Sequence, residues 1–126
     1  MTQLVKKARE IRAKIEEYMI DGYTYDDAFD ELTENDFALA KVISQLEDWS
    51  DSDSCTVTDG VIVEAYENVK DLMRWMPQVN VFYVTNCFKD VQILAREGFT
   101  NIAPANLVKY TDSKCSTVFS IRMERV

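Results

Sequence analysis

The stretch VFYVTNCFKDVQILAREGFTNIAPANLVKY, residues 81–110, changes its hydrophobic pattern twice and decides the fold. With the two residues before it, it opens as VNVFYV, a β-branched and aromatic run that is typical of a buried strand. FKDVQILAREGF follows with helical spacing, and Gly98 can end that helix in the left-handed conformation while Phe99 packs back on it. The apolar positions of this helix are Val91, Leu94 and Ala95. The stretch therefore predicts a strand, a helix and a second extended segment.

Downstream, the pattern predicts a β-hairpin. LVKYT, residues 107–111, and TVFSIRMERV, residues 117–126, are extended segments on either side of a turn that contains DSK, residues 112–114. The residues that we expect on one face of the last strand are Phe119, Ile121 and Met123.

Upstream, DWSDSDSC, residues 48–55, is a polar connector that separates the chain into two parts. CTVT, residues 55–58, is predicted as a short strand. Apolar residues at helical spacing then predict an amphipathic helix that Pro77 stops. They are Ile62, Ala65, Val69, Leu72 and Met76.

The first part predicts a long helix over residues 3–20, which Thr2 can cap and Gly22 can end. Its apolar face is formed by Leu4, Ala8, Ile11, Ile15 and Tyr18. One such face also permits a coiled-coil dimer, so both a monomer and a homodimer stay open.

Two further helices are predicted near residues 25–32 and 34–48. Thr24 precedes Asp27 by three residues, and Thr33 precedes Asp36 in the same way. This spacing is close to the capping box, in which a hydroxyl and a carboxylate satisfy the free amides of a helix start.

Together the elements predict an α+β fold, with an N-terminal three-helix segment packed with a small mixed β-sheet and two further helices. The length of 126 residues suits a single domain over residues 1–126. Residues 1–50 are its acidic helical half and residues 54–126 its α/β half.

The net charge of −8 is placed unevenly. Residues 1–15 carry a charge of +4, and residues 54–126 hold equal numbers of acidic and basic side chains. Residues 16–53 carry thirteen Asp or Glu side chains against Lys41 alone. Direct binding to nucleic acid is therefore disfavoured, because attraction to phosphate needs a cationic surface.

Composition limits the location and the chemistry. MTQLVKKAREIRAKIEEY, the first 18 residues, is charged throughout and lacks an apolar run, so we expect no signal peptide, no membrane contact and a soluble, intracellular, cytoplasmic protein. The chain has no His and no CxxC pair, and its cysteines are Cys55, Cys87 and Cys115. We therefore expect free thiols and no zinc, and we predict no metal, no cofactor and no His-dependent catalysis.

The order of strand, helix, GF and hairpin resembles the C-terminal part of GNAT-type acetyltransferases, over roughly the last third of the chain. In that family a glycine-rich loop before the preceding helix holds the pyrophosphate of acetyl-CoA, and a Tyr four residues before the Gly is often the general acid. Here the corresponding places are CTVTDGVIVEAYENV, with Asp59 where the anion would lie, and Leu94. We transfer no site residue, and the resemblance leaves a divergent acetyltransferase-like enzyme or pseudoenzyme as the alternative function.

Acidic and aromatic residues alternate around the second helix, and this cluster is the candidate site. Its members are Tyr23, Tyr25, Asp26, Asp27, Asp30, Glu31, Glu34 and Asp36. Helix capping and a solvated surface are one explanation for the carboxylates. The functional hypothesis is that the cluster docks on a protein with a basic surface, because closely spaced carboxylates without cations repel one another and aromatic residues favour interface centres. We expect a non-enzymatic interaction module, either an inhibitor or a regulator.

Overall fold

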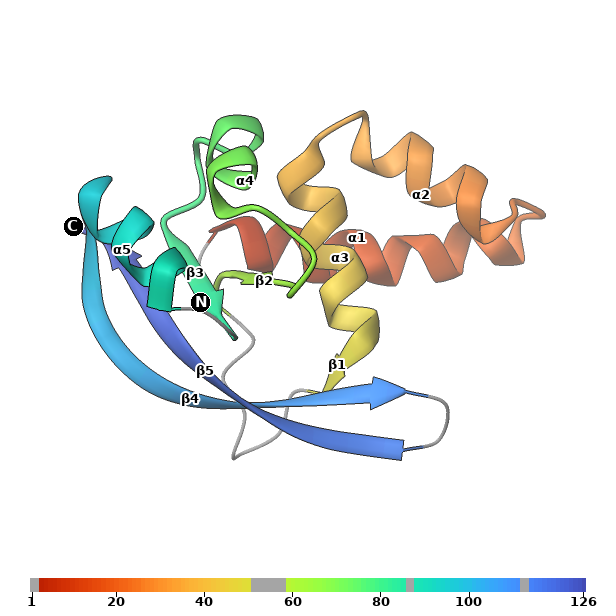
Figure 1. Cartoon of the computed structure of the whole chain (residues 1–126). Helices are drawn as coiled ribbons and strands as arrows, with labels where there is room; N and C mark the ends of the chain where they lie inside the picture. Colours follow the sequence, from red (N-terminus) through yellow and green to blue (C-terminus); the bar gives the residue numbers. More distant parts are fainter. Residues whose placement is uncertain (1–2, 51–58, 86–87, 112–113) are drawn as a thin grey trace.

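The chain begins with three helices and continues with strands between which two further helices lie (Figure 1). The computed structural model describes residues 3–50, 59–85, 88–111 and 114–126. The helices among them are α1 (Gln3–Ile20), α2 (Tyr25–Thr33), α3 (Phe37–Asp48), α4 (Val69–Trp75) and α5 (Phe88–Arg96). The strands among them are β1 (Trp49–Ser50), β2 (Val61–Val63), β3 (Val81–Val84), β4 (Phe99–Thr111) and β5 (Lys114–Arg125). The predicted α+β fold, with three helices packed on a small mixed sheet and two further helices, is confirmed.

α1 has the predicted bounds, and most of its predicted face is buried; Leu4 and Tyr18 of that face are half-buried, and Val5 is buried although it was not predicted there. Its buried residues are Val5, Ala8, Ile11 and Ile15. Gly22, at φ 103°, donates its N–H to Met19 O at 3.1 Å and ends the helix in the left-handed conformation, as predicted. Thr24 then begins α2, because its Oγ1 accepts the N–H of Asp27 at 3.2 Å. Thr2 lies outside the described residues.

The start of α3 differs from the prediction. Asp36, not Thr33, is the N-cap, and its Oδ1 accepts the N–H of Leu39 at 3.1 Å. Thr33 is instead the buried last residue of α2, where its hydroxyl donates to a carbonyl of the preceding turn. Glu34 and Asn35 adopt φ values of 49° and 64°, so these two left-handed residues turn the chain between the helices.

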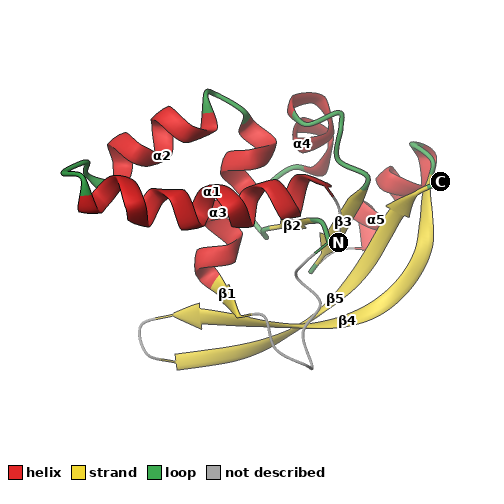
Figure 2. Ribbon diagram, turned by 180° about the vertical axis from the view of Figure 1, so that it is seen from behind, coloured by secondary structure: helices red, strands yellow, loops and turns green. Residues whose placement is uncertain are grey.

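The sheet has the strand order β1-β4-β5-β3-β2. β2 and β3 are parallel neighbours, and the other neighbouring strands are antiparallel. β4 and β5 form the predicted hairpin, whose residues 112–113 lie outside the described part of the chain. An irregularity between Thr100 and Ala103, where Asn101 has φ 59°, accompanies the bend of β4. Both views show α5 inside the curve of this hairpin (Figure 1 and Figure 2).

The prediction of one helix over residues 62–76 is wrong in its first half. Val61–Val63 form β2, and α4 begins only at Val69, with Asn68 as its N-cap. All three residues of β2 are buried, and a short continuous apolar run has no period that separates a strand from a helix. The predicted stop before Pro77 is confirmed. The strand predicted at residues 55–58 lies outside the described residues.

Alternate residues of the sheet face two hydrophobic layers. The first layer joins one face of the sheet to buried residues of all five described helices. Its sheet residues are Val61, Val63, Phe82, Val84, Phe99 and Met123. The second layer lies on the opposite face and contains Trp49, Ile62, Val81, Tyr83, Ala105 and Leu107. The N-terminal helices are therefore bound to the sheet through a shared core.

A buried glutamine of α3 closes the free edge of β2. Gln45, only 4% exposed, donates from Nε2 to Gly60 O at 2.6 Å and accepts the N–H of Ile62 at 2.8 Å. This side chain thus takes the place of a neighbouring strand. Gly60 itself lies against β3, where an added Cβ would come within 2.6 Å of the Val81 carbonyl oxygen.

Two details of the C-terminal half differ from the sequence prediction. Ala95 is exposed, although it was predicted on the inward face of α5. Phe119 is 62% exposed and only Met123 of the predicted strand face is fully buried, because the hairpin extends beyond the helices that cover its base. The packing of Phe99 is confirmed: its ring lies 5.5 Å from that of Phe82, after Gly98 at φ 93°.

Candidate functional site

α2 presents its carboxylates on the side opposite to the core. Ala28 is buried, while the four acidic residues of the helix are exposed. They are Asp26, Asp27, Asp30 and Glu31, and we call them the acidic face. Their spacing places two pairs of like charges at i and i+4, where they repel each other.

The acidic face has no cation bound to it within the described part of the chain. The ion pairs among the described residues lie elsewhere, for example between Arg12 of α1 and Glu47 of α3 at 2.8 Å. Lys41, the only basic residue between positions 16 and 53, is paired with Glu67. The repulsion on α2 is therefore not relieved by a neighbouring Lys or Arg of the described residues.

Two partly exposed tyrosines flank the acidic face. Tyr23 is 42% exposed, and its ring centroid lies 4.9 Å from that of Tyr18. The negative charge of Glu31 is the largest cause that raises the pKa of Tyr23, followed by burial. Tyr25 is 37% exposed, and burial, followed by the charge of Glu47, raises its pKa. Both phenols are thus kept neutral next to carboxylates and can donate hydrogen bonds.

Sequence reasoning missed the apolar end of this surface. Met19 and Ile20, the last residues of α1, are 46% and 85% exposed. They immediately precede the turn that carries Tyr23. The sequence contained a signal for them, because Met19 and Ile20 are apolar residues that lie beyond Tyr18, where the predicted apolar face of α1 ends.

The two remaining predicted residues, Glu34 and Asp36, lie at opposite ends of the α2–α3 turn. Glu34 is exposed and its N–H donates to Asp30 O at 3.2 Å, so it stays next to the acidic face. Asp36 is half-buried, caps α3 and lines a cavity. The structure therefore assembles most of the predicted cluster around α2 and places Asp36 in a different environment.

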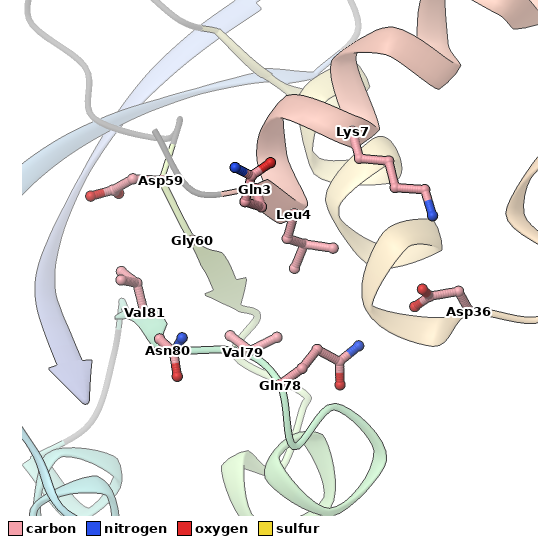
Figure 3. A pocket seen from close by; sticks show the side chains of 10 residues that line it. All are labelled: Gln3, Leu4, Lys7, Asp36, Asp59, Gly60, Gln78, Val79, Asn80 and Val81. Carbon is pink, nitrogen blue, oxygen red and sulfur yellow. The ribbon is translucent and has the colours of Figure 1, made fainter. Parts of the chain in front are cut away.

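That cavity has a volume of about 520 Å³ (Figure 3). It lies between the starts of α1 and α3 on one side and the residues at the starts of β2 and β3 on the other. Its apolar side chains are Leu4, Val79 and Val81. Its polar side chains are Gln3, Lys7, Asp36, Asp59, Gln78 and Asn80. No sequence motif announces this site, since its residues come from four separate segments.

Asp59, at one side of the cavity, is bound by two side chains of the sheet. Tyr83 donates its hydroxyl to Oδ1, and Arg122 donates from Nε to Oδ2 at 2.8 Å. Arg122 also donates to Glu124 at 3.2 Å. Burial disfavours the charged form of Arg122, but the hydrogen bond and charge of Asp59 outweigh it and raise the pKa of Arg122. Both oxygens of Asp59 are therefore engaged.

The carboxyl ends of parallel strands are the usual place for ligands in α/β sheets. At this end of β2, Glu64 accepts hydrogen bonds from Trp49 Nε1 at 3.3 Å and from Lys109 Nζ at 3.4 Å. Glu67 accepts from Lys41 Nζ and from the N–H of Glu64 at 2.9 Å. These carboxylates are structural ion-pair partners. Residues 86–87, at the strand-to-helix turn after β3, lie outside the described residues.

No protein-family model, no curated protein and no solved structure matches this chain. Among the described residues, no group of three or more Cys, Asp or Glu side chains is arranged to hold a metal ion. None of the helices described has both the length and the apolar character that crossing a membrane requires.

Proposed function

We propose that this chain is a non-enzymatic protein-interaction module, an inhibitor or regulator whose acidic face docks on a cationic site of a macromolecular partner. The observation that carries the proposal is the set of four exposed carboxylates on α2 without a cation of the described residues bound to it. The intracellular, soluble setting expected from the sequence is part of the proposal.

Energetics support this use of the acidic face. Each like-charge pair at i and i+4 destabilises a helix by about 0.2–0.5 kcal/mol, and α2 carries two such pairs. A basic partner converts this repulsion into attraction and accelerates association. The exposed Tyr23, Tyr25 and Ile20 add aromatic and apolar area beside the charges, the composition that favours interface centres.

The test begins with partners captured from the native host and continues with purified partner in kinetic binding measurements. The test variant replaces the acidic face by Asp26→Asn, Asp27→Asn, Asp30→Asn and Glu31→Gln. Its matched control removes the same net charge elsewhere, by Glu10→Gln, Asp48→Asn, Asp71→Asn and Glu97→Gln.

The test variant should associate about tenfold more slowly at 0.1 M salt, while the control stays close to the wild type. Raising the salt to 1 M should slow the wild type to the rate of the test variant, because the Debye length falls from ~10 Å to ~3 Å. Equal slowing of both variants would show that association depends on the net charge of the protein and not on the acidic face. Unchanged association of the test variant would show that the acidic face serves solubility.

A divergent acetyltransferase-like protein is the second candidate. The element order β3, α5 and hairpin favours it, since the resemblance rests on this order. The start of α4 disfavours it, because Glu64 and Glu67 precede the N-cap Asn68, whose side chain already caps the helix. Asp59, predicted at this place, lies before β2 instead. Millimolar acetyl-CoA should leave the melting temperature unchanged, whereas a ligand at a hundredfold excess over Kd stabilises the folded state by ~2.7 kcal/mol. A clear upward shift would favour the enzyme.

A further inference from the structure

The cavity of about 520 Å³ beside α1 has the size and the lining of a small-molecule site (Figure 3). Ligand sites commonly measure about 300–1,000 Å³ and combine apolar walls with a few polar groups. Here Val79 and Val81 are buried, and Leu4 is half-buried beside them. Little of Val79 and Val81 is left to cover, so the apolar surface open to a ligand comes from Leu4 and from the methylene groups of Gln3, Lys7 and Gln78.

The carboxylates of the cavity are already engaged. Both oxygens of Asp59 accept hydrogen bonds, from Tyr83 and from Arg122. Asp36 accepts the N–H of Leu39 and lies at the N-terminus of α3, where the helix dipole stabilises its negative charge. Neither carboxylate is thus left as the main partner of a cationic ligand.

The donors of the cavity are not engaged. Lys7 forms no ion pair or hydrogen bond with any of the described residues, and the same holds for three side-chain amides. These amides belong to Gln3, Gln78 and Asn80. In the close view Lys7 extends along the side of the cavity that also carries Asp36, opposite Asp59 (Figure 3). The uncommitted groups are therefore one cation and three amides.

We propose that the cavity binds a small organic monoanion, a carboxylate with an apolar body. The apolar body packs on Leu4 and on the methylene groups of the polar side chains around it, and the carboxylate accepts hydrogen bonds from Lys7 and a neighbouring amide. One lysine matches a single negative charge. A polyanion such as a nucleoside triphosphate is disfavoured, because among the described residues Lys7 is the single uncommitted cation at the cavity, and Asp36 and Asp59 repel it.

Three probes with the same eight-carbon chain separate charge from apolar contact: octanoate, octanol and octylammonium, each below its micelle-forming concentration. They are titrated into the full-length protein labelled with ¹⁵N and followed by backbone amide NMR. Octanoate should cause saturable shifts at residues 3–7, 60–61 and 78–81. Its affinity should exceed that of octanol and octylammonium by about five- to tenfold, the contribution expected of one partly exposed charge-assisted hydrogen bond.

Lys7→Gln should lower the affinity for octanoate to that for octanol and leave octanol binding unchanged. Lys14→Gln is the matched control, since Lys14 is an exposed lysine of the same helix outside the cavity. The acidic-face variant should bind octanoate like the wild type, so failure of the proposed interaction function leaves this result unaffected. Absence of saturable shifts, equal binding of octylammonium, or no effect of Lys7→Gln would overturn the proposal.

Discussion

Gln45 shows how one side chain can complete a sheet. Gln45→Leu should leave Gly60 O and Ile62 N without partners in a buried place and lower the free energy of unfolding by about 2–4 kcal/mol. A urea titration measures this loss. Gln92→Leu is the control on the exposed side of α5 and should change stability by less than ~0.5 kcal/mol. Equal effects of the two substitutions would mean that Gln45 does not support the edge of β2.

Tyr23 reports the field of the acidic face. Glu31→Gln should lower the pKa of Tyr23 toward its ordinary value of 10.0 without fully restoring it, because burial and Asp21 also raise it. The raised pKa means that the folded protein holds this proton more tightly. The resulting contribution to stability is present below pH 10 and disappears as the pH rises through the folded-state pKa.

NMR titration of the tyrosine ring carbons measures this shift. Glu34→Gln is the control, since Glu34 is not among the causes that raise the pKa of Tyr23. A Tyr23 pKa unaffected by Glu31→Gln would contradict the close approach of these two side chains.

At this scale the sequence predicted what depends on local patterns. The acidic face follows from helical spacing, and Gly22 and Gly98 follow from the need for positive φ after a helix. The role of Gln45 could not be predicted, because its partners lie 15 and 17 residues away on another element. Its only sequence signal is a polar residue within an apolar stripe of α3.

Among the elements, the turn between α2 and α3 has a testable cap. Asp36→Ala should lower the free energy of unfolding by about 0.5–2 kcal/mol, because the N–H of Leu39 loses its acceptor. Thr33→Val should cost less than Asp36→Ala, since the Thr33 hydroxyl only bonds within its own helix. Asp30→Ala controls for the loss of one negative charge from this segment. Denaturant titrations rank the variants, and a larger loss for Thr33→Val would restore Thr33 as the start of α3.

The type of an element could be predicted where a hydrophobic pattern continues over many residues. The boundaries of an element could not be predicted where two sequence signals compete. α1 and α5 carry clear helical periods, and both segments were correctly predicted to be helices. Thr33 and Asp36 both offer a capping side chain, and only burial of Thr33 at the end of α2 decides between them. The start of the helix predicted over residues 62–76 is wrong, because Ile62 of β2 fits the helical spacing of Ala65, Val69 and Leu72 by chance.

For the molecule as a whole, the distribution of charge could be predicted from the sequence, whereas the position of the cavity could not. The excess of carboxylates over residues 16–53 predicted the acidic face around α2. The cavity could not be predicted, because Leu4, Asp59 and Val79 meet only after α1 has packed beside the sheet. Sequence patterns identify surfaces made by one element, whereas a site formed by several depends on tertiary packing.

The shared core predicts that the helical and α/β halves unfold together. Ile43 of α3 and Leu94 of α5 are both fully buried in the layer that joins the helices to the sheet. Ile43→Ala and Leu94→Ala should each lower the free energy of unfolding by about 2–5 kcal/mol, through lost burial and a cavity.

Coincident unfolding is the sharper expectation, because helix packing and sheet packing depend on the same side chains. Far-ultraviolet circular dichroism follows the helices. Tryptophan fluorescence, measured with the exposed Trp75 of α4 replaced by Phe in every protein, follows Trp49 in the second layer of the sheet. In urea, both signals should share one midpoint in the wild type and a single lower midpoint in each variant. Separate midpoints, or an Ile43→Ala variant that shifts only the helical signal, would show that the three N-terminal helices unfold independently of the sheet.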